Sequence, residues 1–450
     1  MKTNTHPPPT TPFAPTAIIT HALVVVVLVV VSCWSGLSLG EVVLVEDEAG
    51  ALHVNTSNAT LQPVFVNGVD VGRALQAQQS IIEAQHRTLE AQRTRIDAQR
   101  SAIASLAHQV CPPSVIDRDA TAGSLTSDGS KWAGGVLADN GRIYCTPFYA
   151  PSVLVIDPAT RATATFPVTG IAPQASKWAN GVLGPGGRIY AFPASATTVL
   201  IIDPATNTTD VTTLGDLPAG PRKWGGGGVR ARNGLIYGVP LKASSVLIID
   251  PIANTTDTTT ITGLGDSEYK WYGAALADNG RIYAIPRAAV SVLIIDPATN
   301  TADITTIANL GHFGDNKWAG TVLAGSGKIY GVPLSASSVL IVDAATNTAD
   351  NTTITLSNAN AVDQVYMWLD GVLASNGLIF GVPFTSEAVL IIDPSTNTAD
   401  TTSLPVNEGA FKWAGGVLVD GAGGAGGGGG EVIFGVPYNE EFVLAVDPGC

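Results

Sequence analysis

Short apolar runs separated by turn residues recur along the chain from Lys131 to the C-terminus. One unit, such as the one that starts at Trp271, contains four of these runs. Asp-Asn-Gly separates the first two runs and Asp-Pro-Ala-Thr-Asn the last two, and both sequences favour tight turns. Each unit therefore predicts four short β-strands joined by hairpins.

Seven units follow one another at spacings of 45 to 50 residues, each with a tryptophan at its start. The third run of a unit has the form Val-Leu-Ile-Ile-Asp and is apolar at successive positions, so both faces of that strand must be covered. Sheets stacked around a common axis meet this requirement. The pattern predicts an all-β fold, a seven-bladed β-propeller over residues 111–450. The tryptophans are Trp132, Trp178, Trp224, Trp271, Trp318, Trp368 and Trp413.

Parts of the repeat resemble a known family. The segments IYGVP (residues 236–240) and VLIIDPATNTTDVTTL (residues 199–214) are similar to the YVTN-type repeat of surface-layer and related seven-bladed propellers. The Lys-Trp start of each unit and the proline that ends the second run are not part of that pattern. The resemblance implies the fold and leaves the ligand open.

The N-terminal residues 1–40 predict export. Residues 17–39 lack Asp, Glu, Lys and Arg, and the small residues Ser38 and Gly40 suit signal peptidase, which favours a cleaved secretory signal. The same stretch is long enough to remain as a membrane anchor, and both interpretations predict an extracellular or cell-surface protein. Sequons predict N-glycosylation, although Asn-Thr is also part of the repeated turn. They start at Asn55, Asn58, Asn207, Asn254 and Asn351.

Two further segments precede the repeats. Residues 41–72 contain short alternating apolar runs and predict a small β-rich segment. Residues 73–110 lack Gly and Pro and carry an apolar residue every seven positions, which predicts a coiled-coil helix that serves as a stalk. Glutamine at alternate layers weakens this seam, so the alternatives are a lone amphipathic helix and a homo-oligomer, with a trimer favoured. The apolar positions are Leu75, Ile82, Leu89, Ile96 and Ile103.

The last unit ends after its third run, so another segment must supply its fourth strand. Counting back from Lys131 by the length of the corresponding loop reaches Cys111, and residues 111–130 are therefore predicted to close the ring. Cys450 lies three residues after Asp447, at the equivalent turn. This spacing predicts a Cys111–Cys450 disulfide, with two free thiols as the alternative. Cys145 is predicted to be buried in a second strand.

The charge and residue types exclude several functions. A net charge of -14 without a Lys/Arg cluster excludes nucleic acid and anionic membrane surfaces as partners. The propeller has one histidine, His312, and no calcium-loop sequence, so we expect no metal, no cofactor and no His-dependent catalysis. The run Gly423–Gly430 lacks the Lys of a phosphate loop. The Asp that ends the third run of each unit, which Pro follows in six of the seven units, is explained by its turn.

The most regular polar feature is a lysine directly before the tryptophan of six units, replaced by Met367 in the sixth unit of the chain. The loop that enters the first strand of a blade lies beside the axis, so these residues predict a ligand-binding ring at the channel mouth for an anion or a sugar. The alternative, which the repetition favours, is a purely structural role. The residues are Lys131, Trp132, Lys177, Trp178, Lys223, Trp224, Lys270, Trp271, Lys317, Trp318, Trp368, Lys412 and Trp413.

A second predicted surface consists of variable residues that follow the second-strand proline, because loops on a rigid scaffold carry specificity. Together these features predict an exported, non-enzymatic recognition or surface-structural protein that binds a protein or a glycan. The alternative is an extracellular propeller enzyme, a lyase or hydrolase that acts near the central channel. The variable residues are Phe148, Tyr149, Leu241, Lys242, Arg287, Phe384, Tyr438 and Asn439.

Overall fold

The computed structural model describes residues 42–46, 52–56, 65–66, 69–110, 115–116, 125, 128–171, 176–311, 316–356, 365–406, 408–421 and 430–449, with the backbone alone for 42–72 and 100–115. The predicted leader, the Cys111–Cys450 disulfide, Asn58 and His312 lie outside the described residues, as does most of the glycine run 423–430. Cys145 is a free, fully buried thiol, and burial raises its pKa.

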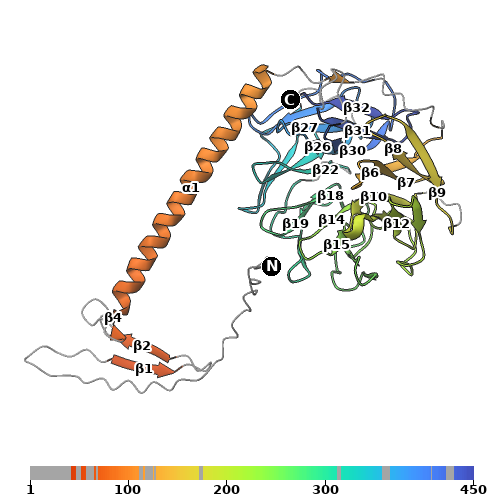
Figure 1. Ribbon diagram of the computed structural model, residues 1–450. Helices are drawn as coiled ribbons and strands as arrows, with labels where there is room; N and C mark the ends of the chain where they lie inside the picture. The colour runs from red at the N-terminus through yellow and green to blue at the C-terminus, as the bar shows by residue number, and fades with distance from the viewer. Residues whose placement is uncertain are drawn as a thin grey trace, which may run out of the picture. The chain divides into compact units, whose positions relative to one another are not determined.

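Seven four-stranded antiparallel sheets follow one another around an axis, which confirms the predicted seven-bladed β-propeller (Figure 1). The first three blades comprise β6 (Trp132–Leu137), β7 (Ile143–Pro147), β8 (Ser152–Ile156) and β9 (Thr163–Pro167); β10 (Trp178–Leu183), β11 (Ile189–Pro193), β12 (Leu200–Asp203) and β13 (Thr208–Asp210), with the 3-10 turn Pro185–Gly187; and β14 (Gly228–Arg230), β15 (Ile236–Gly238), β16 (Leu247–Asp250) and β17 (Thr255–Asp257).

The other four blades have the same strand order. They comprise β18 (Trp271–Leu276), β19 (Ile282–Pro286), β20 (Leu293–Asp296) and β21 (Thr301–Asp303); β22 (Trp318–Leu323), β23 (Lys328–Pro333), β24 (Leu340–Asp343) and β25 (Thr348–Asp350); β26 (Trp368–Leu373), β27 (Ile379–Pro383), β28 (Leu390–Asp393) and β29 (Thr398–Asp400); and β30 (Trp413–Val419), β31 (Val432–Pro437) and β32 (Leu444–Asp447), with β5 (Val115–Ile116) as the fourth strand.

The ring is closed between the two ends of the domain. Strand β5 pairs antiparallel with β32, with Ile116 opposite Val446 and Val115 opposite Asp447. This strand lies in the segment for which the repeat spacing predicts ring closure. A shared apolar core, which includes Trp132 and Phe434, also joins the first blade to the last. The first and last units therefore share both a sheet and an inter-blade core.

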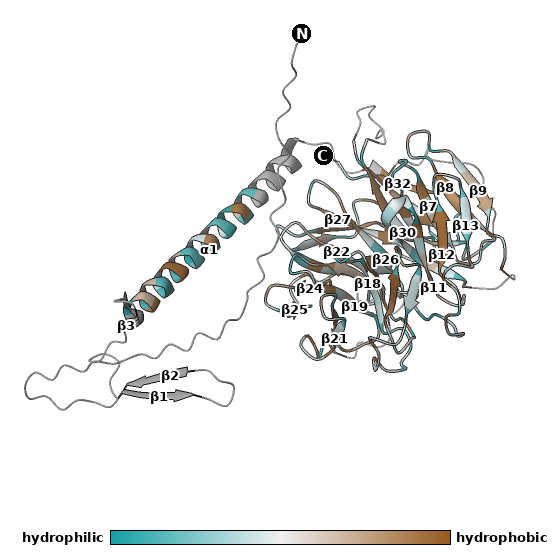
Figure 2. Ribbon diagram, turned by 60° about the horizontal axis from the view of Figure 1, so that its bottom comes forward, coloured by the Kyte–Doolittle hydropathy of each residue, from teal (hydrophilic) through white to brown (hydrophobic). Residues whose placement is uncertain are grey.

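The innermost strands need glycine where they converge on the axis. A Cβ atom added to Gly415 would lie 2.7 Å from the Cα of Gly134 in the neighbouring blade, closer than real Cβ contacts. Away from the axis, the Val-Leu-Ile-Ile strands and the second-strand tyrosines are buried between sheets, in keeping with the hydrophobic colouring of the blades in Figure 2. This layering explains why the third run is apolar at successive positions.

The turns on the far side of the blades also link neighbours. Tyr144 Oη donates to Asn207 Oδ1 of the next blade at 2.9 Å, and Tyr237 Oη donates to Asn300 Oδ1 at 2.6 Å. Asn207 adopts a left-handed conformation with φ 53°, which asparagine tolerates well. The Asn-Thr turn thus has a structural function of its own, and a glycan on Asn207 would compete with this hydrogen bond.

Before the propeller, the described residues form two hairpins and one helix. Strand β1 (Val42–Glu46) pairs with β2 (Leu52–Thr56), and β3 (Phe65–Val66) with β4 (Val69–Asp70). The predicted helix is α1 (Val71–Val110), and hydrophobic bands recur along it between hydrophilic turns (Figure 2). Among the described helices, none combines the length and apolarity needed to cross a bilayer. In α1, the apolar heptad residues Leu75, Ile82, Leu89 and Ile96 are 48% to 63% exposed.

Candidate functional site

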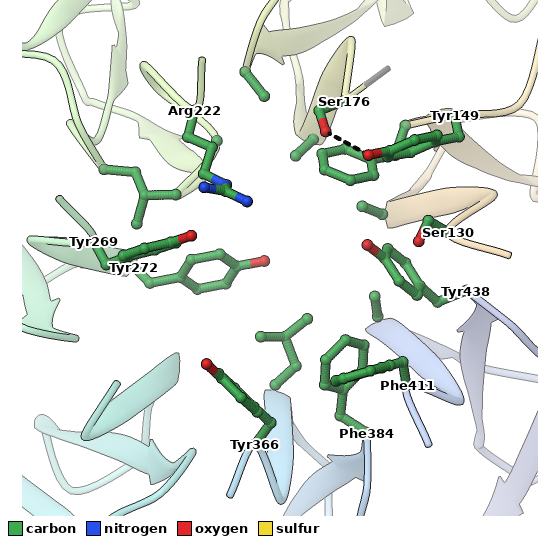
Figure 3. A pocket seen from close by; sticks show the side chains of 18 of the residues that line it. Ser130, Tyr149, Ser176, Arg222, Tyr269, Tyr272, Tyr366, Phe384, Phe411 and Tyr438 are labelled. Carbon is green, nitrogen blue, oxygen red and sulfur yellow. Dashed lines mark hydrogen bonds between the residues drawn. The ribbon is translucent and has the colours of Figure 1, made fainter. Parts of the chain in front are cut away.

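A cavity of about 360 Å³ lies on the axis, at the face where each chain segment enters its innermost strand (Figure 3). Six blades contribute three residues each, from the same three positions of the repeat. These are the residue before the lysine position, the residue after the tryptophan and the residue after the second-strand proline. In the fourth blade they are Tyr269, Tyr272 and Arg287. Only Tyr149 lines the cavity from another position.

A continuous belt of backbone hydrogen bonds fixes these positions. Lys177 N donates to Phe148 O of the preceding blade at 2.8 Å, and Phe148 N donates to Lys131 O of its own blade at 2.9 Å. Equivalent bonds are present in all seven blades, and Lys131 N closes the circle by donating to Tyr438 O of the last blade. The backbone at the cavity wall is therefore rigid, and the blades differ there only in their side chains.

The residue before each lysine position has an unusual backbone conformation. In every blade its φ lies between 52° and 72°, for example 55° at Tyr269 and 57° at Phe411. This left-handed region favours Gly or Asn, and a bulky side chain there is strained. Strain of this kind, stored in a rigid frame, is found mainly at functional sites. The seven residues are Ser130, Ser176, Arg222, Tyr269, Asn316, Tyr366 and Phe411.

The predicted Lys–Trp ring is brought together around the axis but is buried behind the cavity wall. Each lysine and tryptophan of the ring is at most 5% exposed, and none lines the cavity. Lys177 Nζ donates to Phe148 O and Tyr149 O of the preceding blade, while Trp178 Nε1 donates to Thr198 O at 2.7 Å. These contacts give the pairs a structural role. A ligand has no exposed surface of these side chains to contact.

Burial also weakens the charge of the ring lysines. Loss of water contact lowers the pKa of Lys177, Lys223 and Lys270 to about 8. In the sixth blade Met367 takes the same place within an apolar core, so the frame does not require the charge. The repeated Asp residues likewise serve their turns, as Asp203 Oδ1 accepts from Ala205 N at 2.9 Å.

One wall of the cavity is a chain of six aromatic rings, which we call the aromatic arc. Its consecutive neighbours have ring centroids 5.0 to 6.2 Å apart, distances typical of tilted or edge-to-face contacts. Figure 3 shows Tyr149, Tyr438, Phe384 and Phe411 on one side of the cavity and Arg222 and Tyr269 on the other. In order, the arc comprises Tyr149, Phe148, Tyr438, Phe384, Phe411 and Tyr366.

The opposite wall, which we call the arginine cluster, consists of Arg222, Tyr269, Tyr272 and Arg287. The guanidinium carbon of Arg222 lies 5.0 Å from the Tyr269 ring centroid, and that of Arg287 lies 4.7 Å from it and 5.6 Å from the Tyr272 centroid. Such stacking on aromatic faces holds the guanidinium groups in place. The two walls give the cavity one apolar side and one cationic side.

Polar groups beneath the arginine cluster are largely buried. Burial raises the pKa of Tyr272 to about 12, so its hydroxyl stays protonated. Asn180 Nδ2 lies 3.5 Å from that hydroxyl. Asp370 lies close enough to Tyr272 to interact with it electrostatically. Burial raises the pKa of the Asp370 carboxyl to about 6, although the carboxyl accepts hydrogen bonds from Gly371 N and Gly416 N. Among the described residues, no group of three or more His, Cys, Asp and Glu side chains could hold a metal.

Of the second predicted surface, six residues line the cavity. Lys242 instead pairs with Glu268, and Asn439 accepts a hydrogen bond from Ser130 N. The residues before the lysine and after the tryptophan were not predicted from the sequence. The position before the lysine could have been recognised, because it varies between units while the adjacent Lys-Trp pair is almost constant. The six residues are Phe148, Tyr149, Leu241, Arg287, Phe384 and Tyr438.

Comparison with known proteins supports the fold alone. No family model matches the chain, and no curated protein matches it. Virginiamycin B lyase from Staphylococcus aureus is similar in structure, with 11% identity, a TM-score of 0.56 and coverage of 72% of this chain and 97% of that one. A streptogramin B lyase structure gives 12% identity, a TM-score of 0.56 and coverage of 74% and 97%. These likenesses show the propeller fold.

A third similar structure is the extracellular domain of the hybrid two-component system BT4673 from B. thetaiotaomicron. It has 9% identity and a TM-score of 0.52, and the match covers 75% of this chain and 43% of that one. At such identities the shared architecture says nothing about the ligand. Lyases and an extracellular domain of a two-component system share this fold, so function has to be inferred from the cavity.

Proposed function

We propose that the protein is an exported recognition protein that binds a small ligand, or a small group of a larger partner, in the axial cavity. The observation that carries this proposal is the rigid hydrogen-bonded belt, which presents bulky side chains from left-handed positions toward one cavity. Structural needs alone would favour Gly or Asn there. A volume of about 360 Å³ suits a small ligand or a single sugar or side chain of a protein partner.

Binding without chemical conversion agrees best with the lining. The described wall offers hydroxyl and guanidinium groups, and Tyr272 is held protonated by its raised pKa. General base catalysis works best with a pKa near the operating pH. Asp370 approaches this value, but both of its oxygens accept backbone hydrogen bonds. The enzymatic alternative would require Asp370, which does not line the cavity, to reach the ligand, and an Asp370→Asn variant that still converts a bound ligand would exclude that assignment.

The remaining expectations are part of the same proposal. Export agrees with the extracellular location of the similar BT4673 domain, and the YVTN-type assignment of the repeat stays a prediction. The exposed apolar stripe of α1 supports self-association through residues 73–110, which would present several cavities together and raise avidity. Glycan and protein ligands both remain within the proposal.

A substitution that fills the cavity tests the proposed site. Ser176 lies at the position that holds Tyr or Phe in three other blades, so Ser176→Tyr places an aromatic ring on a backbone that already accepts one. Ile252, which is 81% exposed in a turn at the opposite end of its blade, gives the matched control Ile252→Tyr. We expect ligands found in a thermal-shift screen of small molecules and glycans to lose binding only in Ser176→Tyr. Equal binding by both variants would reject the axial site.

A further inference from the structure

The arginine cluster carries two positive charges that no ion pair of the described residues neutralises, although the exposed Glu268, which pairs with Lys242, also attracts Arg222. Among the described residues, neither Arg222 nor Arg287 forms an ion pair, whereas Arg142 and Arg281 pair with Asp157 and Asp296 of their own blades at 3.3 Å. The two cluster arginines stack on the same ring, Tyr269; burial lowers the pKa of Arg287, and repulsion from Arg222 adds a smaller contribution in the same direction. Two like charges in one cavity are unfavourable unless an anion lies between or beside them.

Asn316, which does not line the cavity, fixes the orientation of Arg287. Arg287 Nε donates to Asn316 Oδ1 at 2.6 Å, and Asn316 Nδ2 in turn donates to Tyr366 Oη at 3.2 Å. The described residues provide no hydrogen-bond partner for its terminal nitrogens, and Arg287 lines the cavity. A guanidinium anchored by Nε retains its two terminal nitrogens, the geometry that grips a planar carboxylate with two parallel hydrogen bonds.

The aromatic arc defines the other half of the ligand. Figure 3 shows Tyr149, Tyr438, Phe384 and Phe411 across the cavity from Arg222 and Tyr269. Tyr366, at the end of the arc, lies closer to the arginine cluster and is linked to Arg287 through Asn316. Aromatic side chains bind flat apolar groups through stacking and edge contacts and lose little conformational entropy when they do so. A ligand that satisfies both walls must carry an apolar, preferably aromatic, body at one end and an anionic group at the other.

We infer that the ligand of this cavity is an aromatic carboxylate, or a partner group of that chemistry, with its carboxylate at Arg222 and Arg287 and its ring on the aromatic arc. The inference rests on the proposed function, since it assigns the chemistry of the same cavity. The net charge of -14 opposes the approach of anions, so selectivity comes from contacts within the cavity and not from long-range attraction.

The test compares three naphthalene probes of the same shape on the full chain by isothermal titration calorimetry. They are 2-naphthoate, the neutral 2-naphthylmethanol and the cationic 2-naphthylmethylamine. We expect naphthoate to bind at least about tenfold more tightly than the alcohol, since hydrogen bonds to charged groups are the stronger kind. Tighter binding of the alcohol or the amine, or millimolar concentrations of naphthoate without heat of binding, would overturn the inference.

Charge-removing variants identify the wall responsible. Arg222 is exposed, so Arg222→Gln should fold normally, and it is expected to weaken naphthoate about tenfold while leaving the alcohol within about twofold. Arg281→Gln is the matched control, because Arg281 pairs with Asp296 of its own blade and does not line the cavity. Equal effects of the two variants would overturn the assignment to the arginine cluster. If Ser176→Tyr still abolishes binding of the alcohol, the cavity remains a ligand site and only its anion preference is lost.

Discussion

The Lys–Trp pairs and the cavity-lining positions are direct neighbours in sequence, yet they behave in opposite ways. The pairs are nearly constant between units, buried, and bonded to the backbone of adjacent loops. The position before each pair changes between Ser, Arg, Tyr, Asn and Phe from unit to unit, and in six of the seven units it lines the cavity. In a repeat protein, constancy between units therefore marks the frame, and variation beside a constant frame marks recognition.

The largest expected effect concerns the frame, by which we mean the buried Lys–Trp pairs and the backbone that they bond. Trp318 is fully buried, and its Nε1 donates to Ser338 O at 2.7 Å. Trp318→Ala creates a cavity between blades and leaves that carbonyl without its donor, so the free energy of unfolding should fall by about 3–5 kcal/mol. Urea denaturation measures the loss. The matched lining variant Phe411→Ala, at a residue 39% exposed, should lose far less, and similar losses for both would erase the distinction between frame and lining.

Asp370 belongs to neither set, and its titration sharpens the comparison. Its carboxyl pKa of about 6 lies above the ordinary value of 3.8, so the folded protein holds the proton more tightly than the unfolded chain. The free energy of unfolding should therefore rise by about 2–3 kcal/mol between pH 7 and pH 4, before other carboxylates are protonated. Asp257 and Asp303 act in the opposite direction, since hydrogen bonds lower their pKa to about 2 and stability is lost as they protonate.

The Asp370→Asn variant provides the check. It removes the titrating group while it keeps one acceptor for Gly371 N or Gly416 N. In this variant, the melting temperature should no longer rise as the pH falls from 7 to 5, as it does in the native chain. Parallel curves for the two proteins would show that another group causes the dependence.

The blades could be predicted from sequence because each depends on local information. Strand periodicity, the Asp-Asn-Gly hairpin and a third strand buried on both faces all lie within one unit. The cavity depends on how units meet, and no single unit contains that information. Arg222 and Arg287 belong to consecutive blades, and only the packing of these blades against each other stacks both on Tyr269. The left-handed backbone at Phe411 is equally invisible in sequence, because aromatic residues rarely adopt it.

The smallest expected effect tests whether the lining sacrifices stability for recognition. Phe411 has φ 57° and contacts Phe384 at a centroid distance of 5.0 Å, whereas the fifth blade has Asn316 at the equivalent position. Phe411→Asn relieves a strain of about 1 kcal/mol and loses the ring contacts with Phe384 and Tyr366, which at this partly exposed site together contribute about the same amount. The free energy of unfolding should therefore change by less than about 0.5 kcal/mol, while binding of an aromatic probe weakens. A loss of stability close to that of Trp318→Ala would instead make Phe411 part of the frame, and variation between units would then no longer distinguish recognition from structure.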